Sequence, residues 1–195
     1  MVKQSWKPGN MLYPVPAVLV TCQDEEGNDN VLTVAWAGTV CSDPAMLSIS
    51  VRKERYSHHM IKESGEFVVN LTTAELMRAT DYCGVRSGRD EDKFKAMGLS
   101  KGSAGKVKAP IIMESPVNIE CRVRQVLELG SHDMFIAEVV NVQISEEYMD
   151  EKGSFHLNDA DLLAYSHGEY YTLGKKLGTF GCSVRKPARK KKRNA

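Results

Sequence analysis

Residues 30–59, which read NVLTVAWAGTVCSDPAMLSISVRKERYSHH, are the stretch that decides the fold. Two apolar runs, residues 30–37 and 46–51, alternate with small hydroxyl side chains, a pattern typical of half-buried β-strands. The pair Asp43-Pro44 lies between the runs and is a turn signal. The stretch therefore predicts two strands on either side of a break in the chain.

The residues after the second run have the chemistry of an anion-binding site. Arg52 and Arg55 follow it, and Ser57 begins a predicted short helix. Arginines, hydroxyls and a helix N-terminus together favour a phosphate monoester. Because Trp36 adds a flat aromatic surface nearby, the stretch suggests a phosphorylated cofactor that carries a ring. The residues alone leave simpler interpretations open: solvated arginines, a core tryptophan and a serine that only caps a helix.

Length and composition are those of one globular domain. The chain has 195 residues, of which 42% are hydrophobic, enough for a sizeable core. Its net charge is +1, but residues 185–195 hold seven basic side chains, so residues 1–184 carry a charge of −6. We predict a single domain over residues 1–184 and a basic, disordered tail over residues 185–195. The acidic body argues against nucleic-acid binding, although the tail leaves a nucleic-acid or membrane contact as an alternative.

Cysteine usage and hydropathy indicate the compartment. The five cysteines are scattered without a C-x-x-C pair, which is typical of reduced thiols in a reducing compartment. Cys121 alternates with apolar residues and is predicted to be a small core residue. The N-terminus lacks a signal-peptide pattern and no apolar run reaches membrane-spanning length, so we expect a cytoplasmic protein without membrane contact. The adjacent His58 and His59 point apart on a helix and lack a third ligand, so no metal site is predicted.

The rest of the chain predicts more strands and a few short helices. Residues 117–124 alternate apolar and polar side chains, and a turn at residues 129–132 makes them a hairpin with residues 134–144. A capping-box pair, Thr72 and Glu75, predicts a helix that stops at Gly84. Strands are also predicted at residues 17–22 and 66–71, and helical segments at residues 57–64 and 93–98. Residues 85–92 are predicted to be a surface loop and residues 100–109 a flexible segment. Residues 165–184 are predicted to wrap over their own barrel or over a partner. About six strands favour a closed antiparallel barrel over a doubly wound sheet, and no Rossmann or P-loop motif follows a strand.

A set of short motifs, spread in order from about residue 14 to residue 184, resembles the flavin reductase-like family and within it the flavoredoxin branch. The matching pieces are PAVLVT at residues 16–21, N-x-x-T-x-A-W at 30–36, DP at 43–44, SVR-x-x-RYS at 50–57, GEFVVN at 65–70, DKF at 92–94, EC at 120–121, G-x-H at 130–132 and LG-x-x-LG-x-FG at 173–181. Each piece is weak alone, and the ordered set is fairly specific. The resemblance implies a mainly β fold, an antiparallel, Greek-key type FMN-binding split β-barrel with a few short helices. It also implies a homodimer with one FMN per subunit near the interface.

The resemblance carries roles over to single residues. Ser50, Arg52, Arg55 and Ser57 would hold the phosphate and ribityl chain, with Tyr56 close by. The flavin ring would be lined by Asn30, Thr33, Trp36, Thr39, Val40 and Cys41, and an aromatic side chain, Tyr165, would stand near it. Lys93 and His132 would approach the polar edge of the ring, where either would stabilise developing negative charge and raise the reduction potential. Without the resemblance, Lys93 is a solvated helix lysine and His132 a turn histidine.

The predicted function is an FMN-dependent oxidoreductase that transfers hydride or electrons through its flavin. Its electron donor would be NADH or NADPH, or a redox protein such as ferredoxin. The flavin supplies the chemistry, so no catalytic side chain is named. The alternatives are a non-enzymatic FMN electron carrier of the flavoredoxin type, and a flavin-free binding module that uses its basic tail on nucleic acid.

Overall fold

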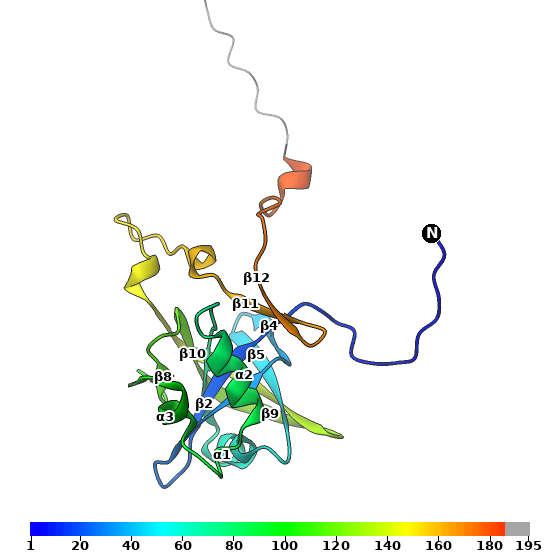
Figure 1. The fold of residues 1–195 in the computed structure, drawn as a ribbon. Helices are drawn as coiled ribbons and strands as arrows, with labels where there is room; N and C mark the ends of the chain where they lie inside the picture. The colour runs from blue at the N-terminus through cyan, green and yellow to red at the C-terminus, as the bar shows by residue number, and fades with distance from the viewer. Residues whose placement is uncertain (186–195) are drawn as a thin grey trace, which may run out of the picture.

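The computed structural model of the chain describes residues 1–185, and its fold is mainly β, as predicted. Seven strands form one antiparallel sheet in the order β3-β2-β6-β9-β10-β5-β4 (Figure 1). Their bounds are β2 Val18–Gln23, β3 Asp29–Val34, β4 Ala37–Ser42, β5 Ala45–Arg52, β6 Glu66–Asn70, β9 Val117–Leu129 and β10 His132–Ile144. The predicted tail, apart from Arg185, lies outside the described residues.

The connection between β3 and β4 closes the sheet into a barrel. These strands are the two edges of the sheet, yet only Ala35 and Trp36 join them. Three Cα–Cα steps cover no more than about 11 Å, so the two edges must come together and the sheet must curl. The edges approach without forming a ladder in the described part of the chain, which leaves the barrel split beside Trp36. The predicted split antiparallel barrel is confirmed.

Apolar side chains from alternate strand positions fill the barrel. The fully buried members of this core include Val20, Ile49, Phe67 and Phe135 from the strands, together with Ile61 from a helix that packs on them. Two thiols also lie there: Cys121, predicted as a core residue, and Cys22, and burial raises the pKa of both to about 12. Burial likewise raises the pKa of Cys83, in a second core under the helices, to about 11.

Three short helices lie outside the barrel: α1 Tyr56–Ser64, α2 Met77–Val85 and α3 Lys93–Met97. α1 and α3 end at Gly65 and Gly98, as predicted, because each glycine takes the left-handed conformation that reverses the chain. α2 and α3 cover β2 and β3 through a second apolar core (Figure 1). The members of this core are Leu19, Val31, Leu76, Ala79, Cys83, Phe94, Leu99 and Ile112.

Two local predictions were wrong. The capping box fails because the Thr72 hydroxyl donates to the carbonyl of Ala17 instead, and α2 begins only at Met77. Gly84 lies inside α2 rather than after it, and a Cβ atom there would be 3.3 Å from the Cβ of Thr33, so it allows helix and strand to approach closely. The sequence also missed β4, whose small, largely exposed residues lack apolar alternation.

The remaining elements lie at the rim of the barrel. β1 Val15–Pro16, β11 Leu163–Ser166 and β12 Glu169–Thr172 form a three-stranded sheet, and β7 Lys101–Gly102 pairs with β8 Ile111–Ile112. Three 3₁₀-helices complete the chain: Glu146–Tyr148, Leu157–Ala160 and Cys182–Val184. Within residues 1–185, none of the helices has the length and apolar character needed to cross a membrane.

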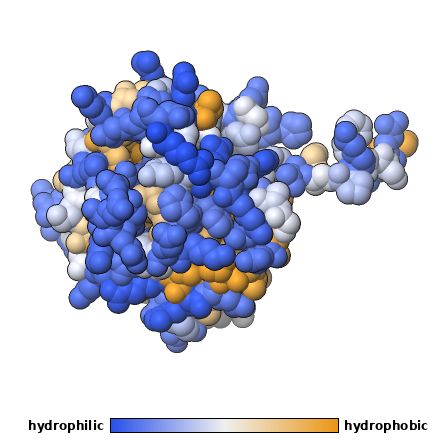
Figure 2. Space-filling view, turned by 90° about the horizontal axis from the view of Figure 1, so that it is seen from below, coloured by the Kyte–Doolittle hydropathy of each residue, from blue (hydrophilic) through white to orange (hydrophobic). Residues whose placement is uncertain are grey.

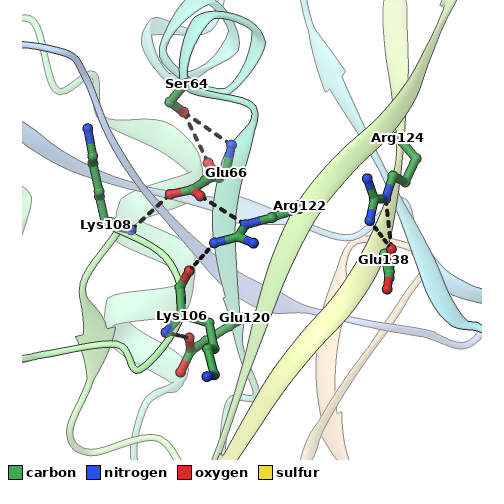
Figure 3. Close-up of polar contacts among 8 residues, drawn as sticks. All are labelled: Ser64, Glu66, Lys106, Lys108, Glu120, Arg122, Arg124 and Glu138. Carbon is green, nitrogen blue, oxygen red and sulfur yellow. Dashed lines mark hydrogen bonds and ion pairs between the residues drawn. The ribbon is translucent and has the colours of Figure 1, made fainter.

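A network of carboxylates fixes the segment 100–109 against β6 and β9 (Figure 3). The Glu120 side chain is fully buried and accepts hydrogen bonds from the backbone N–H of Gly105 (2.8 Å) and Lys106 (2.6 Å). It also accepts from Asn141 Nδ2 at 2.7 Å and Gln143 Nε2 at 2.9 Å. On the same side, Glu66 accepts from the backbone of Lys108 and from Arg122, whereas Arg124 and Glu138 form an exposed ion pair between β9 and β10.

Both ends of the described chain extend away from the barrel. Residues 1–8 and 173–185 lead outward in Figure 1, and residues 9–12 connect the N-terminal part to the barrel, where they line a cavity. They expose the large apolar side chains of Trp6, Met11, Leu12, Leu173, Leu177, Phe180 and Val184. Most of the face shown in Figure 2 is hydrophilic, with one larger hydrophobic patch and smaller hydrophobic areas elsewhere on it.

Candidate functional site

A cavity of about 370 Å³ lies where the end of β5, the start of α1 and the loop between α2 and α3 meet. Five cationic side chains and one carboxylate line it. The lining residues are Asn30, Leu32, Arg52, Glu54, Arg55, Tyr56, Ser57, Arg86, Ser87, Gly88, Arg89 and Lys93. Six of the predicted site residues, from three separate segments of the chain, therefore come together here.

The first turn of α1 is suited to an anion. The N-cap residue is Arg55, which makes no side-chain capping bond, and the first turn contains no acidic residue. Backbone N–H groups at such an end lack helical partners and attract negative charge. Ser57 lies inside the first turn rather than at the cap, and its hydroxyl accepts a hydrogen bond from Asn30 Nδ2 at 2.7 Å. Helix, hydroxyl and arginines thus converge as the sequence predicted.

Lys93 is buried at the inner wall of this cavity, with 3% of its surface exposed. Its Nζ lies 3.5 Å from the carbonyl of Cys83 and 3.4 Å from that of Arg86, at the outer limit of hydrogen bonding. Burial, reinforced by the charge of Arg55, lowers the pKa of Lys93 below its ordinary value. A buried ammonium so loosely held would be stabilised by an anion in the cavity.

The loop between α2 and α3 supplies residues that the sequence analysis treated only as a surface loop. Arg86 and Arg89 both line the cavity, and the guanidinium of Arg89 lies over the Tyr56 ring at 5.5 Å from its centroid. Gly88 packs directly on Asn30, so that a Cβ atom there would lie 2.2 Å from the Asn30 Oδ1. The signal available in the sequence was two arginines flanking Ser-Gly between two helices. Only the packing of α2 on β3 brings that loop to the site.

Two further cavities continue from the first along the split of the barrel. The middle one, about 130 Å³, shares Arg52 and Arg55 with the cationic cavity and reaches Trp36. The outer one, about 680 Å³, shares Trp36 and Ser50 with the middle one and is more apolar. Predicted residues also line these cavities: Thr33, Trp36, Ser50 and His132 in the middle, and Trp36, Thr39, Val40 and Ser50 outside. The three cavities are neighbours that share lining residues, and we call them together the groove; it is cationic at one end and aromatic and apolar at the other.

His132 faces the middle cavity from the start of β10, opposite Arg52 in the strand register. Burial and the neighbouring Arg52 charge lower the pKa of His132. Lys93 lines the cationic cavity rather than the middle one, so the structure does not bring the two residues to the same part of the groove. Each is a separate donor facing the groove.

Two predicted residues, Cys41 and Tyr165, lie outside all three cavities. The Cys41 Sγ is 3.4 Å from the carbonyl of Asp43 in the turn between β4 and β5. Tyr165 belongs to an aromatic cluster that reaches the groove indirectly, because its ring contacts Tyr13 (6.0 Å between centroids) and Tyr13 contacts Trp36 (6.2 Å). Thr33 does line the groove, but its hydroxyl donates to the carbonyl of Thr80.

A family model, a curated relative and two solved structures resemble this chain over most of its length. The family model described as "Flavin reductase like domain" matches residues 10–174. An uncharacterized protein of Archaeoglobus fulgidus is 34% identical over 161 residues, which is 83% of this chain and 89% of that protein. The structure of flavoredoxin from Desulfovibrio vulgaris (Miyazaki F) superposes with a TM-score of 0.87 at 31% identity, covering 94% of this chain and all of that one. Flavoredoxin from Methanosarcina acetivorans gives a TM-score of 0.84 at 29% identity with the same coverage.

Proposed function

This chain belongs to the flavin reductase-like family, and we propose that it binds FMN in the groove and transfers hydride or electrons through it. One observation carries the proposal: a cavity lined by five cations and a more open cavity beside Trp36 lie on either side of a small cavity that shares lining residues with both. FMN has the matching chemistry, with a phosphate monoester at one end and a flat aromatic ring at the other.

The donors around the cationic cavity fit a phosphate group. Arg52 and Arg55 offer charge-assisted hydrogen bonds, and the first turn of α1 offers backbone N–H groups and the Ser57 hydroxyl. The Asn30–Ser57 hydrogen bond holds that hydroxyl in place. Trp36, Thr39 and Val40 would then contact the ring in the outer part of the groove. The bound flavin would supply the redox chemistry, whereas these side chains would bind and orient it.

Lys93 in the cationic cavity and His132 in the middle cavity would set the electrostatics of the groove. A buried ammonium and an imidazole N–H both stabilise negative charge that develops nearby in a site of low dielectric. The low pKa of His132 keeps its imidazole neutral at pH 7, so it would act as a hydrogen-bond donor rather than as a cation. No side chain of the groove need act as a nucleophile.

An enzyme and an electron carrier remain two candidate forms of this function. The outer cavity of about 680 Å³ beside Trp36 favours the enzyme, because it leaves room for a second molecule next to the ring. Rapid oxidation of NADH or NADPH by the FMN-loaded protein with an added acceptor would support the enzyme. Inertness to both nucleotides, together with reduction by ferredoxin, would support the carrier.

We also propose that the protein is a homodimer with its flavin near the interface. The ends of the chain expose large apolar side chains such as Leu177 and Phe180. A second copy would cover these side chains. Sedimentation equilibrium should give twice the mass of the chain, and a monomer at micromolar concentration would contradict the dimer.

The proposal is tested by the visible spectrum after FMN is added and excess removed by desalting. A retained yellow chromophore is expected, and a colourless protein would refute FMN binding. Arg52→Ala should weaken FMN binding about tenfold, because the phosphate loses one charge-assisted partner. The matched control is Arg124→Ala, which removes an equally exposed arginine from the β9–β10 ladder and should leave FMN affinity unchanged.

A further inference from the structure

We propose that Asp133, a buried carboxylate that lines none of the three cavities, is a positioning residue for the anion-binding first turn of α1. The inference rests on the proposed FMN site and assigns the group that fixes its phosphate-binding end. Asp133 would act through Lys53 and His58, which flank residues 54–57 of the cationic cavity. It would not touch the ligand itself.

Asp133 lies on β10 directly after His132, and only 1% of its surface is exposed. Its Oδ2 accepts a hydrogen bond from His58 Nε2 at 2.9 Å. Its Oδ1 lies 3.3 Å from Lys53 Nζ in an ion pair without hydrogen-bond geometry, and within residues 1–185 it is the only buried side-chain polar atom that lacks a hydrogen bond. Burial raises the pKa of Asp133, but the hydrogen bond from His58 and the charge of Lys53 outweigh burial and lower that pKa below its ordinary value. The core therefore holds an ionised carboxylate with fewer hydrogen bonds than Glu120 receives.

His58 and Lys53 tie two parts of the phosphate-binding end to this carboxylate. His58 lies in the first turn of α1, and its ring contacts Phe135 of β10 at 5.4 Å between centroids. Lys53 lies in the tight turn between β5 and α1, where the N–H of Arg55 donates to the carbonyl of Arg52 at 3.0 Å. The N–H of His58 donates to the carbonyl of Arg55 at 2.9 Å and joins this turn to the helix. One carboxylate on β10 thus restrains both the arginine turn and the first helical turn.

The cost of this arrangement points to a role in binding. A buried carboxylate with one hydrogen bond is a weak source of stability, because taking its charge out of water offsets the attraction of its partners. Charge-assisted contacts to a phosphate, in contrast, need their donors within about 0.5 Å of the productive position. The cationic cavity also holds like charges that repel one another, so the turn that carries Arg52 and Arg55 needs an anchor outside the cavity.

The experiment compares the dissociation constants of FMN and of riboflavin, which lacks the phosphate, by fluorescence titration of flavin-free protein. Asp133→Asn removes the charge at nearly constant shape. Its matched control, Glu128→Gln, removes a carboxylate that also pairs with Lys53 but is 65% exposed. Lys53→Met breaks the ion pair from its exposed side, and Lys62→Met, which changes a similarly exposed lysine of α1, is its control. About 0.5 M NaCl in the titrations screens the loss of a distant charge.

Asp133→Asn should weaken FMN binding about tenfold and riboflavin binding by less than about twofold, because only the phosphate-binding end is displaced. The loss of charge alone predicts the opposite sign, since removing a negative group near cations favours an anion. Glu128→Gln should therefore leave FMN binding within about twofold of wild type. Lys53→Met should weaken FMN binding about threefold and Lys62→Met less, which decides the matter if Asp133→Asn does not fold.

Two results of these titrations overturn the proposal. One is FMN binding that is unchanged or tighter in Asp133→Asn, or equal FMN binding in Lys53→Met and Lys62→Met. The other is an equal loss of FMN and riboflavin binding in Asp133→Asn, because Asp133 would then have only a general structural role.

Failure of the proposed function would look different, because wild-type protein would bind neither flavin. Hydrogen exchange on the flavin-free protein tests the position of the turn in either case. Amide exchange at Arg55 and His58 should be about tenfold faster in Asp133→Asn than in wild type. Exchange at Thr80 of α2, whose N–H donates to the carbonyl of Leu76, should not change. Unchanged exchange at Arg55 and His58, or an equal rise at Thr80, overturns the proposal.

Discussion

Two polar regions of this barrel differ in how completely their charges are satisfied. Around Glu120, a buried carboxylate accepts four hydrogen bonds from two backbone N–H groups and two side-chain amides. Around Lys93, a buried ammonium reaches only two carbonyls at 3.4 and 3.5 Å, and arginines face it across a cavity. The first region is complete without a ligand and stabilises the fold, whereas the second is incomplete without an anion.

The difference follows from what each region costs to fold. Burying a charge without partners is expensive, so a buried carboxylate persists only where donors surround it. The segment 100–109 supplies those donors to Glu120 and is fixed in return (Figure 3). The cationic cavity retains like charges close together, which destabilises the ligand-free protein. Such an arrangement is typical of a binding site.

The largest expected loss of stability comes from disrupting the hydrogen bonds around Glu120. Glu120→Gln replaces an acceptor of four hydrogen bonds with an amide that brings its own donors, leaving buried N–H groups unpaired. We expect the free energy of unfolding to fall by about 3–5 kcal/mol, measured by urea denaturation. FMN affinity of the folded fraction should not change, because no cavity of the groove includes Glu120. An unchanged unfolding free energy would show that the network is not a source of stability.

A smaller loss of stability is expected from a change in the loop between α2 and α3, where this loop packs against the groove. Gly88→Ala places a Cβ atom against the Asn30 side chain and must shift either the loop or the Asn30–Ser57 hydrogen bond. We expect a loss of about 1–3 kcal/mol in unfolding free energy, together with weaker FMN binding by fluorescence titration. Gly174→Ala, where no atom lies within 4 Å of the new Cβ, is the control and should change neither quantity. Equal effects of the two variants would contradict the close packing.

The smallest effect on stability, and one of opposite sign, is expected from Lys93→Met. Replacing a poorly paired buried charge with an apolar side chain should stabilise the flavin-free protein by about 1 kcal/mol at pH 7. The same variant should bind FMN more weakly. A variant that is less stable than wild type would show that the two carbonyls satisfy Lys93 better than their distances indicate.

The difference in unfolding free energy between Lys93→Met and wild type should depend on pH in a defined direction. Because the pKa of Lys93 is lowered on folding, the unfolded chain binds more protons between that pKa and 10.5. The cost of burying the charged lysine is fully present below this window and disappears as pH rises through it. The stability advantage of Lys93→Met should therefore shrink between pH 7 and pH 10, measured by urea denaturation without FMN.

The sequence predicted the strands of the barrel where it has a continuous apolar run or clear side-chain alternation, and failed where both are absent. The hairpin of β9 and β10 follows from its alternating pattern, whereas β4, an edge strand of small residues, gives no such signal. Glu120 occupies a polar position of a strand predicted to be half-buried, yet it is fully buried because the distant segment 100–109 covers it. That cover is tertiary packing, which strand periodicity does not contain.

The same contrast between local sequence patterns and tertiary packing explains which residues of the cationic cavity were predicted. Arg52, Arg55 and Ser57 are close in sequence, so one motif predicted their joint role, and the structure brings them together with Asn30. Arg86 and Arg89, on the loop between α2 and α3, reach the cavity only because α2 packs on β3 through Cys83 and its neighbours. Sequence reasoning could find one wall of the cavity but not the other.

The three buried thiols affect where the protein would be oxidised. With pKa values of about 11 to 12, Cys22, Cys83 and Cys121 are ionised in only about one molecule in 10⁴ to 10⁵ at pH 7. Peroxide attacks the thiolate, so these three sulfurs are protected from oxidation by both chemistry and burial. Cys41 and Cys182 are the accessible thiols of the described chain. Oxidative damage would begin at these two outer positions and leave the barrel interior intact.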